Sequence, residues 1–185
     1  MDRRPVAMIG DIIEGKGHRL YGLSAINQRA HALQTAWLAE QAACDAALIA
    51  ACLVHDIGHM VHDLGDDPAK DGIDDKHEDL GQLWLARWFG PEVTEPVRLH
   101  VAAKRYLCAA EPDYYSKLSS DSVRSLALQG GPMSALELAA YRANPYAEAA
   151  TTLRRFDERA KVRGLATPTV AHFLPYVVAC ENPAA

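Results

Sequence analysis

One segment, residues 46–61 (AALIAACLVHDIGHMV), constrains the fold more than any other part of the chain. Projected as a helix, it is apolar on almost every side, and Asp45 directly before it is a favourable N-cap. A helix without a polar face has to be covered by other elements. We therefore predict that this segment is the central buried helix of a helical domain.

The rest of the chain indicates further helices and gives no strand signal, neither an alternating run of β-branched residues nor an Asn-Gly hairpin. Predicted helix starts are Ser24, Asp74 or Asp75, Thr94, residues 118–122, Ser134 in a capping-box pattern with Glu137, Asn144-Pro145 and Thr167-Pro168. Glycine-containing breaks at 90–91, 130–132 and 164 separate these helices, and residues 62–75 are expected to form a loop. The prediction is an all-α bundle of about seven to eight helices in one domain over residues 1–185.

Composition narrows the class of protein. Nineteen basic against 24 acidic residues give a net charge of −5, which argues against nucleic acid or an anionic membrane as a partner. No apolar run reaches the ~20 residues of a membrane span, and residues 1–14 lack the apolar core of a signal peptide. Four cysteines without CxxC spacing are expected to be reduced thiols, so we predict a cytoplasmic protein and leave its oligomeric state open.

Six histidine and aspartate side chains predict a metal centre. His55 and Asp56 lie in the central segment, where a buried carboxylate costs several kcal/mol unless it is paired or binds a metal. An isolated pair could equally be a neutral histidine beside an aspartate bonded to the backbone or to an arginine. The further candidates come from four other predicted helices: His31, His77, His100 and Asp157. Imidazole and carboxylate ligands suit iron, manganese or zinc, and six exceed the need of one ion, which favours two metals bridged by a carboxylate.

The order of these residues resembles the HD-domain superfamily, an all-α metal-binding fold. Many of its members hydrolyse phosphate esters, whereas a smaller branch consists of mixed-valent diiron oxygenases. Four segments are similar to the bacterial oxygenases that cleave the C–P bond of 1-hydroxyphosphonates, and more distantly to myo-inositol oxygenase. They are HDIGH (55–59), LHVAAKRYLC (99–108), YYSKLSSDSVRSLALQGGPMS (114–134) and LRRFDERAKVRGLATPTVAHFLP (153–175). The similarity covers about residues 5–178, which favours the oxygenase branch. A metal-dependent phosphohydrolase is the alternative.

The resemblance implies an Fe(II)/Fe(III) pair with O2 as cosubstrate. It assigns His31, His55, Asp56 and Asp157 to one iron, with Asp56 bridging to a second iron. His77 and His100 complete the second iron. Cleavage would convert R–CH(OH)–PO3 and O2 into a carboxylic acid and phosphate.

Three positions are expected to hold the phosphonate. Lys104 is i+4 from His100, and His59 is i+4 from His55, which puts each pair on one helix face. The helix start near Ser122 offers free N–H groups and a positive dipole end. In the related oxygenases the equivalents of His59, Lys104 and this helix N-terminus bind the phosphonate. The alternatives are a solvated surface lysine and an ordinary helix cap.

Residues 15–24 correspond to a lid in the relatives that oxidise a primary amine. Tyr21 stands where their tyrosine can occupy the vacant iron site, and Ser24 replaces their amine-binding glutamate. A neutral hydroxyl favours a quaternary ammonium or no amine. We therefore expect 1-hydroxy-2-(trimethylammonio)ethylphosphonate, giving glycine betaine, with 2-amino-1-hydroxyethylphosphonate and hydroxymethylphosphonate as alternatives. Aromatic side chains could hold a trimethylammonium group, and the candidates are Tyr21, Trp84, Tyr106, Tyr114 and Tyr115. Three histidines match no ligand position and are expected at the surface or behind the ligands: His18, His62 and His172.

Overall fold

The computed structural model describes residues 4–18, 26–61 and 72–182. The described residues form ten α-helices and a short 3-10 helix (Tyr115–Lys117), with no strand among them. The helices are α1 (Pro5–Lys16), α2 (Gln28–Gln41), α3 (Ala46–Val54), α4 (Ile57–Val61), α5 (His77–Leu85), α6 (Pro91–Ala110), α7 (Ser120–Leu128), α8 (Ala135–Arg142), α9 (Ala147–Arg159) and α10 (Val170–Ala179). The all-α prediction is confirmed.

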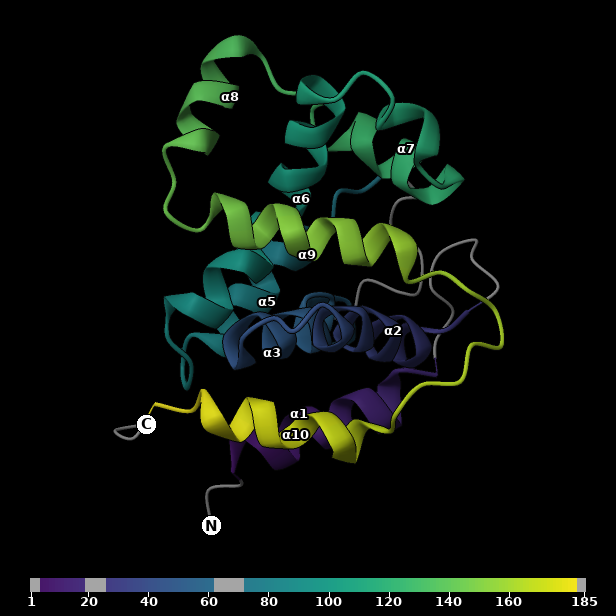
Figure 1. The fold of residues 1–185 in the computed structure, drawn as a ribbon, viewed down its shortest axis with the longest axis vertical. Helices are drawn as coiled ribbons and strands as arrows, with labels where there is room; N and C mark the ends of the chain where they lie inside the picture. Colours follow the sequence, from purple (N-terminus) through teal and green to yellow (C-terminus); the bar gives the residue numbers. More distant parts are fainter. Residues whose placement is uncertain (1–3, 19–25, 62–71, 183–185) are drawn as a thin grey trace.

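Helix α3 lies at the centre of the molecule, as its apolar sequence predicts. Its last six residues are all buried, and α2, α6, α9 and α10 pack around it. Figure 1 shows the layers: α2 and α3 lie side by side in the middle, α9 crosses on one side, and α1 and α10 cover the other. The large apolar side chains of α3 and α4, such as Leu53, Ile57 and Met60, fill this core.

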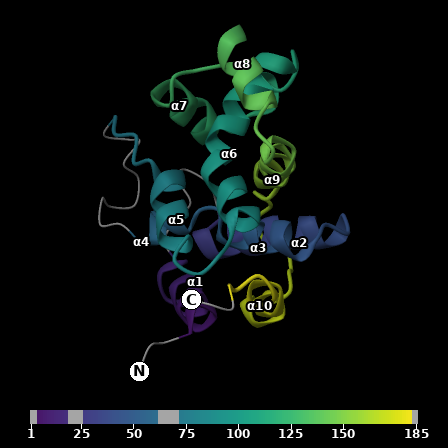
Figure 2. The same ribbon diagram turned by 90° about the vertical axis from the view of Figure 1, so that its left-hand side faces the viewer.

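The long helix α6 joins this core to a smaller outer part. It runs along the molecule and carries α7 and α8 at its far end (Figure 2). A second apolar cluster, made of Leu99, Ala103, Tyr141 and Ala150, holds α8 against α6 and α9. The N-terminus of α7 is directed at α9, because Ser119 donates its backbone N–H to Glu158.

Several helix boundaries agree with the prediction. Asp45 and Ser119 cap α3 and α7, and Ser134 forms a capping box with Glu137 at the start of α8. Three predicted caps are wrong: those at Ser24, Thr94, and Asp74 or Asp75, where Lys76 is the N-cap of α5. Asn27, not Ser24, caps α2, because its side chain accepts the Ala30 N–H at 2.8 Å.

The start of α6 and the number of helices also differ from the prediction. Pro91 begins α6, so Thr94 lies inside its first turn and donates its hydroxyl to the Gly90 carbonyl. The described residues contain ten α-helices instead of the predicted seven or eight, because α1 is an additional helix and the central segment breaks at residues 55–56. Helix α1 carries no side-chain cap, and it is stabilised by burial of Ile9 and Ile13.

No helix in the described ranges has the length and apolar character needed to cross a bilayer. All four cysteines are free thiols, with Cys52 buried and the other three partly exposed.

Candidate metal centre and anion-binding site

The break between α3 and α4 places two consecutive side chains in one site. Neighbouring positions on a regular helix point about 100° apart. Residues 55 and 56 instead form a turn between the two helices. His55 and Asp56 are both buried there, at 0% and 4% exposure. The expectation that His55 and His59 share a face of one helix is therefore wrong, because the helix ends before His55 and a new one begins at Ile57.

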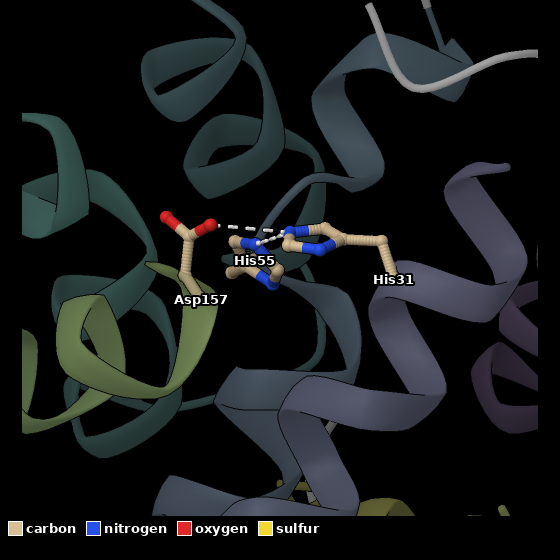
Figure 3. Close-up of side chains that lie close together, drawn as sticks. All are labelled: His31, His55 and Asp157. Carbon is tan, nitrogen blue, oxygen red and sulfur yellow. Dashed lines mark hydrogen bonds and ion pairs between the residues drawn. The ribbon is translucent and has the colours of Figure 1, made fainter. Parts of the chain in front are cut away.

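A first group of potential ligands comes from three helical segments: His31 on α2, His55 after α3, and Asp157 on α9. The Nε2 atoms of His31 and His55 lie 3.1 Å apart, and His31 Nε2 is 3.2 Å from Asp157 Oδ1 (Figure 3). All three side chains are buried.

A second group consists of Asp56, His77 at the start of α5, and His100 on α6. His77 and His100 bring their Nε2 atoms to 3.1 Å of each other, and each is 3.5 Å from Asp56 Oδ1. The other oxygen, Asp56 Oδ2, lies 3.3 Å from His55 Nε2 and 3.5 Å from His31 Nε2. Asp56 therefore directs one oxygen to each group.

The four imidazoles are oriented as metal ligands. Each donates its Nδ1–H to an oxygen. Three of these oxygens are backbone carbonyls: that of Ala160 for His31, of Cys52 for His55 and of Val97 for His100. The fourth is the Asp75 carboxylate, which accepts from His77. Such bonds fix the tautomer and turn the Nε2 lone pair inward. Two lone pairs face each other at 3.1 Å only with a proton or a metal ion between them.

The two buried carboxylates of the site, Asp56 and Asp157, also require positive charge beside them. Asp56 Oδ2 is buried and has no hydrogen-bond donor among the described residues. Burial opposes ionisation of Asp56 and Asp157, yet the charges of His55 and Arg154 hold the pKa of each well below the usual range. Burial also disfavours the charged form of His77, but its bond to Asp75 and nearby carboxylates raise its pKa to about 9. The donor set and its charge fit metal binding.

His59 packs against His77 of the second group. Its ring stacks on His77, with centroids 3.8 Å apart, and its Nδ1 lies 2.7 Å from Asp75 Oδ2. The Asp75 carboxylate thus bridges His59 and His77. The sequence indicated Asp75 only as a helix cap, because its metal-site role depends on how α4 packs against α5.

Lys104 is buried, with 3% exposure, so it is not the solvated surface lysine of the alternative interpretation. Its ammonium donates to Ser125 Oγ at 2.7 Å. No carboxylate forms an ion pair with it within the described part of the chain. Burial, followed by the positive charge of Arg154, lowers the pKa of Lys104 to about 7.

A cationic cluster that the sequence did not reveal surrounds Ser122. Arg154 Nη2 donates to Ser122 Oγ at 3.0 Å, and Lys161 Nζ lies 3.2 Å from the same oxygen. Arg154 also binds Asp157, so it links this cluster to the first group of potential ligands. The available signal was the spacing: Arg154 lies three residues before Asp157 on α9, and Lys161 lies four residues after Asp157, just beyond the end of that helix.

The remaining predicted positions fall into three sets. Tyr21, Ser24 and His62 lie outside the described residues, as do residues 19–24 of the expected lid; Gly15 and Lys16 belong to the end of α1. His18 and His172 are exposed, as expected.

The described aromatic candidates for a trimethylammonium group have different surroundings. Tyr114 is buried and accepts from Arg154 at 3.2 Å, whereas Tyr115 is about half exposed. Tyr106 stacks on Tyr141, and Trp84 packs against Trp88 and Arg87.

The chain belongs to the HD-domain family, whose model matches residues 29–153. It is similar over most of its length to enzymes that oxidise phosphonates. It is 40% identical over 172 residues, 93% of this chain and 88% of the relative, to the glycine-betaine-forming 1-hydroxy-2-(trimethylamino)ethylphosphonate dioxygenase of Leisingera caerulea. It is 41% identical over 176 residues, 95% of this chain and 87% of the relative, to the hydroxymethylphosphonate dioxygenase of Gimesia maris. An uncharacterized protein of Acanthamoeba polyphaga mimivirus is 30% identical over 138 residues, 73% of this chain and 63% of that protein. The predicted family is confirmed.

Proposed function

We propose that this protein is a diiron dioxygenase that cleaves the C–P bond of a 1-hydroxyphosphonate. The balanced reaction is R–CH(OH)–PO3H2 + O2 → R–COOH + H3PO4. It removes four electrons from the substrate, and one O2 accepts all four, so no further reductant is needed. The observation that carries the proposal is Asp56, whose two oxygens face two separate groups of potential ligands.

In this proposal the first group would hold one iron and the second group the other, and Asp56 would offer one carboxylate oxygen to each group. The ligands are His31, His55, Asp56, Asp157, His77 and His100. An Fe(II)/Fe(III) pair bound there would supply a site for O2 and an electrophilic site for the substrate's hydroxyl oxygen. Arg154 orients Asp157, and Asp75 orients His77, so each of these two ligands is fixed by a charged neighbour.

The phosphonate would lie between the irons and the N-terminus of α7. Lys104 is a buried ammonium, and it gains a charge partner when the phosphonate binds. Ser122, Arg154 and Lys161 supply further donors on the same side of the metal groups. These contacts would orient the C1 carbon, which contributes to the rate through positioning.

His59 is proposed to contact the substrate. Because its Nδ1 is held by Asp75, its Nε2 can accept or return a proton at the substrate's oxygens. Tyr21 is proposed to close the iron site when substrate is absent, with residues 15–24 acting as a lid.

We propose the trimethylammonium compound as the substrate, because Ser24 offers no carboxylate to a primary amine and because one relative carries that activity in its name. Hydroxymethylphosphonate is the second candidate, supported by the relative of equal similarity. We also propose that residues 1–185 form one HD domain and that the protein works in the cytoplasm.

The proposal is tested by phosphate release from three substrates, after anaerobic reconstitution with iron. The substrates are the trimethylammonium, primary-amine and unsubstituted 1-hydroxyphosphonates, each assayed with and without O2. We expect release that requires O2 and matches O2 uptake one to one. Equal release without O2, or release from ordinary phosphate esters, would establish a metal-dependent phosphohydrolase instead.

A further inference from the structure

Glu158, the residue after Asp157 on α9, lies inside the cationic cluster. Its Oε1 accepts the backbone N–H of Ser119 at 2.9 Å. Its Oε2 accepts from Ser122 Oγ at 3.0 Å and from Lys161 Nζ at 3.1 Å, and it is also bonded by Arg154. The side chain is 11% exposed, so these protein groups, not water, satisfy most of its hydrogen-bonding capacity.

The donors around Glu158 are those that an oxyanion of phosphorus requires. They comprise the backbone N–H of Ser119, the N-cap residue of α7, together with a hydroxyl, a guanidinium and an ammonium. This combination of a helix N-terminus with cationic side chains is typical of phosphate-binding sites. A side chain of the protein therefore already uses the donors that the phosphonate would use.

Lys104 distinguishes this arrangement from an ordinary structural ion-pair network. In such a network every cation would have an acidic partner. The described residues give Arg154 and Lys161 such partners, but they give the buried Lys104 only the hydroxyl of Ser125. The three cations together thus exceed the negative charge of Asp157 and Glu158. The cluster can therefore hold one more negative charge than Asp157 and Glu158 supply.

We propose that Glu158 is a placeholder for the phosphonate, which displaces its carboxylate from Ser119, Ser122 and Lys161. This inference rests on the proposed function, since it concerns the same substrate. The exchange of one anion for another keeps Arg154 and Lys161 paired in both states, and the second negative charge of a phosphonate dianion supplies the partner that Lys104 lacks. Because Glu158 competes for the donors, it weakens the binding of phosphonate and of the product phosphate.

The test is the affinity of the iron-loaded protein for inorganic phosphate, measured by isothermal titration calorimetry. Glu158→Gln keeps the size of the side chain and removes the competing charge. We expect this variant to bind phosphate roughly tenfold more tightly than the wild type. The matched control is Glu111→Gln, because Glu111 pairs with Arg155 at an exposed position outside the cluster. Its phosphate affinity should equal that of the wild type.

A second measurement does not depend on the variant. In a crystal structure of the wild-type protein with phosphate, the Glu158 side chain should have left the Ser119 N–H, with phosphate oxygens in its place. Unchanged or weaker phosphate binding by Glu158→Gln, or a phosphate complex in which Glu158 keeps its bonds, would overturn the inference. Both results are independent of turnover. O2-dependent phosphate release by the wild type decides the proposed function separately.

Discussion

Gly58 and His77 are in direct backbone contact: a Cβ atom built on Gly58 would lie 1.9 Å from the carbonyl oxygen of His77. Only glycine allows α4 to approach the first residue of α5 this closely. The contact sets the position of His77 relative to His59 and Asp75. The distances within the second group of ligands therefore depend on residue 58 being a glycine.

Gly58→Ala should destabilise the protein and disrupt the second group. The added methyl group overlaps backbone atoms that no rotamer change can move, so we expect a loss of ~1–3 kcal/mol in the free energy of unfolding, or more. Thermal melting and iron content of the purified variant check this. Gly15→Ala is the matched control, because nothing lies within 4 Å of its added Cβ. In helix α1 that change should be neutral or stabilising by ~0.5–1 kcal/mol. Equal melting of Gly58→Ala and wild type would contradict the prediction.

Metal stoichiometry should follow the position of Asp56 between the two groups. The wild type is expected to bind close to two irons per chain, and Asp56→Ala nearly none, since each iron loses a charged ligand. His100→Ala should retain about one, because the first group remains intact. The measurement is elemental analysis with matched protein quantification. Asp113→Ala, at an exposed position, serves as the control. One zinc per chain with full activity would rule out the diiron centre.

Lys104→Ala should weaken substrate binding and leave iron content unchanged. Loss of a hydrogen bond to a charged group costs about 1.5–3 kcal/mol, which corresponds to a roughly 10- to 150-fold higher KM. Steady-state kinetics on the preferred phosphonate measure this. Lys117→Ala changes an exposed lysine and should have no effect. Unaltered kinetics of Lys104→Ala would remove Lys104 from the anion site.

The low pKa of Lys104 predicts a pH dependence of substrate binding. Burial and Arg154, with a smaller effect of Lys161, lower this pKa to about 7, while Asp157 and Glu158 oppose the shift. The ammonium is present below that pH and is lost above it, so KM should rise by roughly tenfold between about pH 6.5 and 8.5.

Lys104→Arg provides the control for this pH effect, because a guanidinium stays charged throughout the range. In this variant only the phosphonate changes its ionisation in the pH range. Its second deprotonation increases its negative charge and therefore favours binding at higher pH. The KM of the variant should therefore stay level or fall as pH rises. Parallel profiles for wild type and variant would show that Lys104 does not titrate in this range.

Ser24→Glu should change the preference for the distal group of the substrate. A carboxylate would accept hydrogen bonds from a primary amine and crowd a trimethylammonium group, with a swing of ~1.5–3 kcal/mol in relative transition-state binding. Values of kcat/KM for both substrates, with wild type and variant, check this. A wild type that already prefers the primary amine would disprove the assignment of the trimethylammonium substrate.

The helix class and three of the helix starts could be predicted because their causes are local. Asp45, Ser119 and Ser134 cap helices through bonds to residues three positions ahead, so the spacing is visible in the chain. Helix α1 was missed because its stability comes from burying Ile9 and Ile13 against distant elements, without a capping side chain. Thr94 was misassigned because Pro91 can begin the helix without a hydroxyl cap.

The sequence by itself determined the all-α class, the central helix and the six candidate ligands, because an apolar segment that contains a histidine and an aspartate has few ways to be buried. Tertiary structure decided how those side chains are grouped. The break at residues 55–56 sends His55 to one group and lets Asp56 face both. Only packing between helices brought Asp75 to His59, and Glu158 to the N-terminus of α7. Such contacts depend on the relative positions of whole helices, which local residue patterns do not encode.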